Sequence, residues 1–163
     1  MAKELRTSPK WKQRVVKHKR GMTAKPETNF WKNVKKLLTN GKDHYLVSRI
    51  ESYVTPGFPD CVVFHRDTGF FTLELKIVRR NKKGIGKVLV SPLQLAWNTI
   101  HMISGAPVYT LVSDPSLRTV KLFTSAKLQE LRDMDYDSVP GALYEGPLEG
   151  MQLSKLLKLP NSR

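Results

Sequence analysis

The stretch GFPDCVVFHRDTGFFTLELKIV, residues 57–78, decides the fold of this chain. It contains two apolar runs, 61–65 and 70–78, separated by Asp67-Thr68-Gly69. Runs of this kind on either side of a short glycine-containing turn are typical of an antiparallel β-hairpin. The second run contains Glu74 and Lys76, although a buried strand would favour Val or Ile there. The two charged residues therefore need a place in the fold where an apolar strand can carry them.

The alternation of side chains along a strand accounts for Glu74 and Lys76. Successive side chains point to opposite faces, so Glu74 and Lys76 share one face and the intervening apolar residues share the other, which we expect to lie against the core. A turn centred near Thr68 pairs residues whose numbers sum to about 134–136. This register places Asp60 opposite Glu74 or Lys76. We therefore expect these three residues to meet in one patch at the edge of a sheet.

Such a patch suits metal-assisted hydrolysis. Two neighbouring carboxylates repel each other and raise each other's pKa, and a lysine relieves only part of that repulsion. A divalent cation relieves it fully, and oxygen ligands suit Mg²⁺ or Mn²⁺. A metal-bound water can attack a phosphodiester, with Lys76 orienting the water or neutralising transition-state charge. The simpler interpretation of Glu74 and Lys76 is an ion pair on a half-exposed strand.

The other segments complete an α/β pattern. Pro26 and Asn40-Gly41 delimit a helix with apolar residues at helical spacing. A second helix opens at Ser91-Pro92-Leu93-Gln94, where Ser91 and Gln94 form a capping box. Its apolar stripe consists of Leu93, Trp97, Ile100 and Ile103. Strands are predicted over 44–54, 61–65, 70–78, 107–113 and 118–123, and further helices over 124–134 and near 150–158. We predict a central mixed sheet of about five strands, flanked by helices.

Composition and charge limit the function classes. The 163 residues carry a formal net charge of +14, and residues 1–36 hold twelve Lys and Arg against two Glu. This favours a polyanionic partner, with nucleic acid ahead of an anionic membrane. We expect a basic flexible arm over 1–25, whose nucleic-acid contacts would be Lys12, Arg14, Lys17, Lys19 and Arg20. A main domain over 26–134 and a C-terminal extension over 135–163 would follow.

Several other classes are disfavoured. No apolar run approaches the roughly 20 residues of a membrane span. The first residues lack the apolar region of a secretory signal. The single cysteine, Cys61, excludes an internal disulfide and fits a reducing cytosol. We therefore expect a cytoplasmic protein.

The motifs in their order resemble a known nuclease superfamily. GFPD, a hairpin, LELK, a basic loop, SPLQ opening a helix and GAPVYTLVSD closing on a strand are similar to the PD-(D/E)xK nucleases. Within that superfamily the chain looks most like the virus-type replication–repair nucleases, with a structural likeness to archaeal Holliday junction resolvases. The resemblance covers roughly residues 27–123 and implies a restriction-endonuclease-like core. It would suit a virus or phage source, and hence the host cell cytoplasm.

The resemblance also implies roles for individual residues. Asp60 and Glu74 would be metal ligands together with the Leu75 backbone carbonyl, and Lys76 would be the catalytic lysine. Gln94 matches the glutamine that the family carries near the scissile phosphate, in addition to its role in the capping box. A further acidic ligand remains open between two residues. Glu27 fits by its position on the first helix, although it would face inward, and Glu51 on the first strand is its rival.

The residues that follow the proposed site suggest how nucleic acid is held. The segment RRNKKGIGK reads as a basic loop that grips phosphates through Arg79, Arg80, Lys82, Lys83 and Lys87. We expect a Mg²⁺-dependent DNA endonuclease, with Mn²⁺ as a substitute, that selects DNA structure such as branched or flapped DNA or a Holliday junction. The family implies a 5′-phosphate product, and a homodimer would suit cleavage of two strands. The alternatives are a non-catalytic nucleic-acid-binding protein on a nuclease fold and an RNA-directed nuclease.

Overall fold

The computed structural model describes residues 26–41, 44–50 and 56–157. Four α-helices and seven strands alternate along this part of the chain, together with short 3₁₀ turns. The helices are α1 Pro26–Asn40, α2 Pro92–Ile103, α3 Leu128–Asp133 and α4 Leu153–Leu156. The strands are β1 Leu46–Arg49, β2 Cys61–His65, β3 Gly69–Arg80, β4 Gly86–Val88, β5 Val108–Asp114, β6 Thr119–Thr124 and β7 Tyr144–Gly146.

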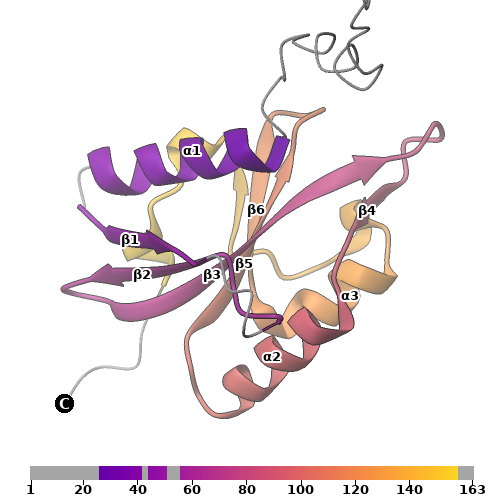
Figure 1. The fold of residues 1–163 in the computed structure, drawn as a ribbon. Helices are drawn as coiled ribbons and strands as arrows, with labels where there is room; N and C mark the ends of the chain where they lie inside the picture. Colours follow the sequence, from indigo (N-terminus) through magenta and orange to yellow (C-terminus); the bar gives the residue numbers. More distant parts are fainter. Residues whose placement is uncertain (1–25, 42–43, 51–55, 158–163) are drawn as a thin grey trace, which may run out of the picture.

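One mixed sheet forms the centre of the molecule (Figure 1). Its strand order is β1-β2-β3-β5-β6-β7, and β4 pairs with the far end of β3. All neighbouring strands are antiparallel except β3 and β5, which are parallel and are joined through α2. The predicted mixed sheet flanked by helices is confirmed. The sequence predicted about five strands, fewer than the seven in the sheet. It missed β4 and β7 because strands of three residues are too short to show a periodic pattern.

The β2–β3 hairpin has the register that the sequence predicted. Its pairs run from His65↔Gly69 at the turn to Cys61↔Leu73. Continuing this register by one residue sets Asp60 beside Glu74. The expected place of the patch was wrong, however, because β5 pairs along the other side of β3 from Thr72 to Ile77. The patch therefore lies in the middle of the sheet, where β3 extends beyond the first residue of β2.

Both faces of the sheet carry a hydrophobic core. On one face, α1 and the C-terminal segment pack on β2, β3, β5 and β6 through residues that include Val34, Leu38, Leu73 and Leu153. On the other face, α3 and the segment after it enclose a second core, to which Leu95 of α2 adds. Glu74 belongs to this second face and is fully buried. Both faces of β3 are therefore covered, by α1 on one side and by α2 and α3 on the other, as expected for a sheet flanked by helices.

Residues beyond 134 are part of this folded unit. Tyr136 and Val139 are buried in the second core, and Met151, Leu153 and Leu157 are buried in the first. β7 extends the sheet beside β6. Residues 135–157, assigned from the sequence to an extension, thus complete both layers. The predicted arm over 1–25 and the last residues, 158–163, lie outside the described part of the chain.

The segment after Ile77 is a hairpin, although the sequence predicted a loop. β3 continues to Arg80, turns at residues 81–85 and returns as β4. Arg80 holds this hairpin in place: its guanidinium donates to Asp114 at 3.0 Å, to Asp137 at 2.7 Å and to the Gly84 carbonyl at 2.7 Å. The strand therefore continues past its apolar residues because an internal ion-pair network anchors it.

Helix α2 begins as its sequence predicted but presents an unexpected face. The Ser91 hydroxyl accepts a hydrogen bond from the Gln94 amide, and the Gln94 side chain accepts one from the Ser91 amide. An apolar stripe ordinarily faces a core. In this helix Leu93, Ile100 and Ile103 are exposed, and Asn98 is the buried residue.

Within the described ranges, no helix has the length and apolar character that crossing a membrane requires.

Replacing Ser91 with Ala tests the cap of α2. The variant loses the hydroxyl acceptor for the Gln94 amide, and we expect the free energy of unfolding to fall by about 1 kcal/mol in urea denaturation. Ser104→Ala is the matched control at the other end of the helix. Its hydroxyl bonds back to the Ile100 carbonyl, a contact that contributes little to helix stability. Equal losses in the two variants would contradict the importance of the capping box.

Candidate active site

The site lies just before β2 begins. Cys61 is the first residue of β2 and pairs with Leu73, so the Leu75 amide has no strand partner on that side. The Asp60 carboxylate takes this position and accepts the Leu75 N–H at 2.7 Å. Because the N–H and C=O of one residue point to the same side of an extended strand, the Leu75 carbonyl also faces the Asp60 side. The Asp60 carboxylate therefore takes the place of a strand partner for Leu75.

Glu74, Lys76 and Gln94 form a closed triangle beside Asp60. The Lys76 ammonium lies 2.9 Å from Glu74 Oε1 and donates to Gln94 Oε1 at 2.8 Å. The Gln94 amide nitrogen donates to Glu74 Oε1 at 2.7 Å. α2 thus returns over the sheet and fixes the rotamers of both charged side chains of β3. Gln94 acts in the capping box and in this triangle at once, as the sequence allowed.

Burial dominates the electrostatics of the two carboxyl groups. Burial, together with the charge of nearby Asp60, raises the pKa of Glu74 to about 7, and the contacts with Lys76 and Gln94 oppose this shift. The pKa of Asp60 is also raised by burial, against the Leu75 hydrogen bond and the charges of Lys76 and Arg49. Burial likewise raises the pKa of the Cys61 thiol to about 12, so this cysteine is not a nucleophile.

The donor set fits a hard divalent cation. Glu74 Oε2 is buried without a hydrogen-bond partner, which is costly for a carboxylate oxygen unless another ligand accepts its charge. The Leu75 carbonyl faces the side of the strand on which the Asp60 carboxylate binds the Leu75 amide. Two carboxylates and a carbonyl suit Mg²⁺ or Mn²⁺, which keeps several waters. Within the described ranges, no cluster of three or more His, Cys, Asp or Glu side chains is placed to hold a metal.

The two candidates for a further acidic ligand are placed differently. Glu27 lies on α1, across the sheet from Glu74, and its side chain is 56% exposed instead of facing inward. Its ion-pair partner there is Arg79, at 3.8 Å. The first turn of a helix is a favourable position for an exposed acid, and this accounts for its orientation. Glu51 lies outside the described residues.

The basic residues predicted to grip phosphate fall into two groups. Arg80 and Lys87 already have hydrogen-bond partners within the protein. Arg80 binds Asp114 and Asp137, and the Lys87 ammonium donates to the Asp133 and Met134 carbonyls at the end of α3. Arg79, Lys82 and Lys83 are exposed on the β3–β4 hairpin. The predicted contacts Lys12, Arg14, Lys17, Lys19 and Arg20 lie outside the described residues.

Two residues near the site were not identified as part of it from the sequence. Arg49 is paired with Cys61 across β1 and β2, and its charge lowers the pKa of neighbouring Asp60. The same register argument that placed Asp60 could have located it, had the β1 pairing been known. Asn98, fully buried, donates to the Gln94 carbonyl at 2.8 Å and so supports the helix that carries Gln94.

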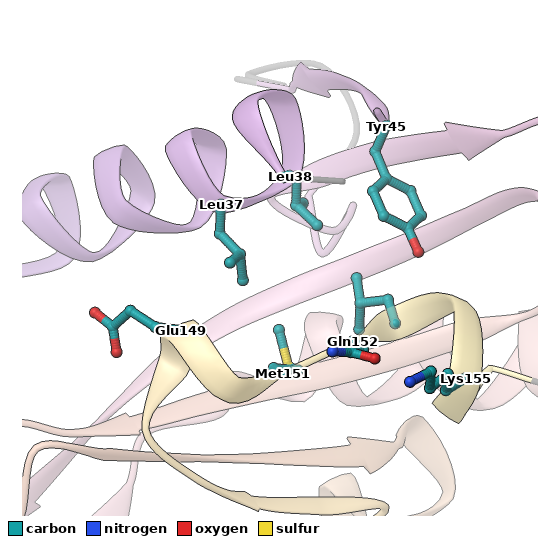
Figure 2. Close-up of a pocket in the computed structure, with 9 residues that line it drawn as sticks. Leu37, Leu38, Tyr45, Glu149, Met151, Gln152 and Lys155 are labelled. Carbon is teal, nitrogen blue, oxygen red and sulfur yellow. The ribbon is translucent and has the colours of Figure 1, made fainter. Parts of the chain in front are cut away.

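A separate cavity lies on the opposite face of the sheet. It has a volume of about 450 Å³ and separates the end of α1 from the segment 149–155 (Figure 2). Leu37 and Leu38 approach it from α1, and Met151 lines its other side. Glu149 is the one carboxylate in its lining, so the cavity lacks the paired carboxylates of the Asp60–Glu74 site.

Comparisons with known proteins support the fold. No family model and no curated protein sequence matches the chain. Among solved structures, the chain is similar to Hjc, a Holliday junction resolvase from the archaeal hyperthermophile Archaeoglobus fulgidus. The TM-score is 0.50 and the identity 16%, over 78% of this chain and 99% of the resolvase. The predicted likeness to archaeal resolvases, and with it a PD-(D/E)xK nuclease-like fold, is confirmed as a likeness of fold.

The raised pKa of Glu74 predicts a pH-dependent stability. The pKa of Glu74 is about 7 in the folded protein and about 4.5 in the unfolded chain. Between pH 4.5 and pH 7 the folded protein therefore holds a proton on Glu74 that the unfolded chain has lost. Without divalent metal, the free energy of unfolding should therefore fall as pH rises through this window, by at most about 1.4 kcal/mol per pH unit.

Glu74→Gln provides the comparison for this prediction. The amide cannot ionise, so the stability of the variant relative to wild type should increase between pH 5 and pH 8. Urea denaturation in EDTA at each pH measures the difference. Parallel profiles for the two proteins would show that Glu74 titrates normally.

Proposed function

We propose that this protein is a metal-dependent endonuclease that hydrolyses phosphodiester bonds in DNA. The proposal rests above all on the Glu74 carboxylate. Burying it costs folding free energy, one of its oxygens is held by Lys76 and Gln94, and the other has no partner. A site that needed only an ion pair would leave neither oxygen unmatched. Its position on a resolvase-like fold adds support.

Each residue of the site has a distinct role in this proposal. Asp60, Glu74 and the Leu75 carbonyl would hold Mg²⁺, or Mn²⁺ in its place. When bound, the metal would act as a Lewis acid and lower the pKa of its bound water. Lys76, with its side chain 13% exposed, would place a positive charge where the phosphate becomes more negative during attack. Gln94 would keep Lys76 and Glu74 oriented, because it bonds to both.

The distribution of charge supports backbone recognition. The exposed basic residues Arg79, Lys82 and Lys83 project from an anchored hairpin that extends the same strand as Glu74 and Lys76. Lysine and arginine contacts to phosphates position a nucleic acid without reading its sequence. We therefore propose selectivity for DNA structure, with branched DNA as the first substrate class because the structural neighbour is a Holliday junction resolvase.

The rival functions differ in what they require of the site. A non-catalytic binding protein would need the basic surface but not an unmatched, buried carboxylate oxygen. An RNA-directed nuclease would use the same residues on another substrate. The virus-type replication–repair group, a viral or phage source and a host-cytoplasm location stay predictions from the sequence.

A cleavage panel tests the proposed activity. Linear, nicked, flapped and four-way DNA, with matched single-stranded RNA, would be incubated with the protein and Mg²⁺ or Mn²⁺. Lys76→Ala should reduce cleavage by about 100-fold or more because it removes positive charge from the transition state. Asp60→Asn should reduce it through loss of metal affinity, and the measured metal affinity should fall with it.

Lys155→Ala is the matched control for the lysine variant. Lys155 lies on α4 over the opposite face of the sheet, so its loss should leave cleavage unchanged. Tight binding without cleavage of any DNA would contradict the enzyme proposal and favour the binding protein. Wild-type activity in Lys76→Ala would contradict the role of Lys76.

The β3–β4 hairpin makes a separate prediction about binding. Replacing Lys82 and Lys83 together with Ala should weaken DNA binding and reduce the slope of log affinity against log salt by roughly 0.9 for each lysine that contacts a phosphate. Fluorescence anisotropy at several salt concentrations measures this slope. Lys32→Ala with Lys35→Ala on α1 removes the same charge elsewhere. An equal effect of both pairs would indicate a general charge effect instead of a local grip.

A further inference from the structure

Three rings, those of Phe58, Trp97 and His101, form an aromatic stack beside the candidate active site. Phe58, from the loop before β2, lies against Trp97 of α2, with ring centres 5.0 Å apart and planes inclined by 57°. Trp97 in turn stacks on His101, with ring centres 3.6 Å apart and planes inclined by 14°. All three side chains are half-buried, and within the described residues neither hydrophobic core includes Phe58 or Trp97. The aromatic stack is therefore a feature of the surface, separate from the cores.

The aromatic stack is held in place from both sides. Gly57 has a φ of +87°, and a Cβ on it would lie 2.3 Å from the Leu93 carbonyl oxygen. The loop that carries Phe58 therefore runs directly against the first turn of α2. On the helix, His101 Nδ1 donates to the Trp97 carbonyl at 2.8 Å, which fixes the orientation of the imidazole. The two outer rings of the stack are thus positioned by contacts within the protein.

The aromatic stack lies next to the candidate active site. Phe58 is two residues before Asp60 in the chain, so their Cα atoms are at most about 7 Å apart. Gln94, the helix residue of the site, precedes Trp97 by three residues, and residues three apart are neighbours on one side of a helix. From Gln94 to His101 the helix advances by roughly 10 Å. A strand with one phosphate in the candidate active site can therefore bring a neighbouring base to the stack.

The composition of this surface favours a nucleobase as the ligand. α2 contains no Lys, Arg, Asp or Glu, so its side chains offer no cation to a phosphate. Flat aromatic faces bind bases by stacking, largely without regard to sequence. The nearly parallel Trp97–His101 pair already has a spacing close to the rise of roughly 3.4 Å between bases along a DNA strand. A base would continue this stack, while lysine and arginine side chains elsewhere on a chain of net charge +14 contact its phosphates.

We propose that the aromatic stack binds one unpaired base of the DNA, next to the phosphate that is cleaved. This inference rests on the proposed nuclease function and specifies its substrate. Bases inside a duplex are already stacked on one another, and extruding one of them costs free energy. A flap or an open branch point presents an unpaired base without that cost. Flapped DNA should therefore be preferred to a fully paired four-way junction or a linear duplex.

Binding to flapped DNA with single bases removed tests the proposal on the wild-type protein. Fluorescence anisotropy in EDTA would compare an intact labelled flap with versions that carry one abasic site at successive nucleotides around the branch point. Stacking of one base on aromatic side chains is strong enough that its loss should weaken binding by about 10-fold. This loss should occur at one or two adjacent positions, and abasic sites elsewhere should leave the affinity unchanged.

Phe58→Leu and His101→Leu each remove one outer ring of the stack, and leucine retains an apolar contact with Trp97. The variant that lacks the ring beneath the base should bind the intact flap about 10-fold more weakly. It should lose no further affinity when that base is absent, because both changes remove the same contact. A purely structural role of the ring would not produce this coupling.

Three further variants serve as controls for the leucine variants. Phe58→Tyr and His101→Phe each keep an aromatic ring and should bind the intact and the abasic flap as wild type does. Phe70→Leu removes a phenyl ring that is 67% exposed near the start of β3, away from the site, and it should leave both affinities unchanged.

Two results would overturn the inference. Abasic sites that weaken binding equally at every position, or at none, would show that no single base is stacked. A missing base that costs the same affinity in wild type and in both leucine variants would place its contact elsewhere on the protein. These measurements require neither metal nor cleavage. Coupling without cleavage of any DNA would therefore contradict the nuclease but not the stacking, and cleavage without coupling would do the reverse.

Discussion

The structure depends on one constraint: a carboxylate, Glu74, lies on the central strand with no exposure to solvent. A buried charge must be matched by partners or neutralised. Lys76 supplies opposite charge from the same strand, and Gln94 supplies a donor from the helix that follows. The crossover from β3 through α2 to β5 is therefore more than a connection between strands. It brings to Glu74 the partner that allows it to be buried.

The different lengths of β2 and β3 create the other half of the site. Because β2 begins only at Cys61, the Leu75 amide needs another acceptor, and the Asp60 carboxylate supplies it. The strand end therefore sets two acids side by side while satisfying one backbone group. Beyond this point β3 turns to a different neighbour, β4, and the Arg80 network holds that hairpin against the end of β5. The residues of the candidate site and the exposed basic hairpin are in this way joined by one continuous strand.

The likeness to an archaeal resolvase and the local geometry support the proposal at different levels. At 16% identity, the comparison shows a similarity of fold. The distances among Glu74, Lys76 and Gln94 describe the chemistry of the site. They are observed in the structure of this chain and do not come from the comparison. An unmatched oxygen on Glu74 has no structural benefit, so it is the feature that most favours a functional role for the site.

The sequence by itself determined the local parts: the hairpin and its register, the capping box of α2 and the approach of Asp60 to Glu74, because periodicity and turns act over a few residues. Only the tertiary structure decided that β5 covers the far side of β3, which moves the site from an edge to the middle of the sheet. It also decided that the stripe from Leu93 to Ile103 faces outward, and that Glu27 turns to Arg79. An apolar stripe indicates that a surface will be covered, but whether the cover comes from the same chain or from another depends on contacts between distant residues.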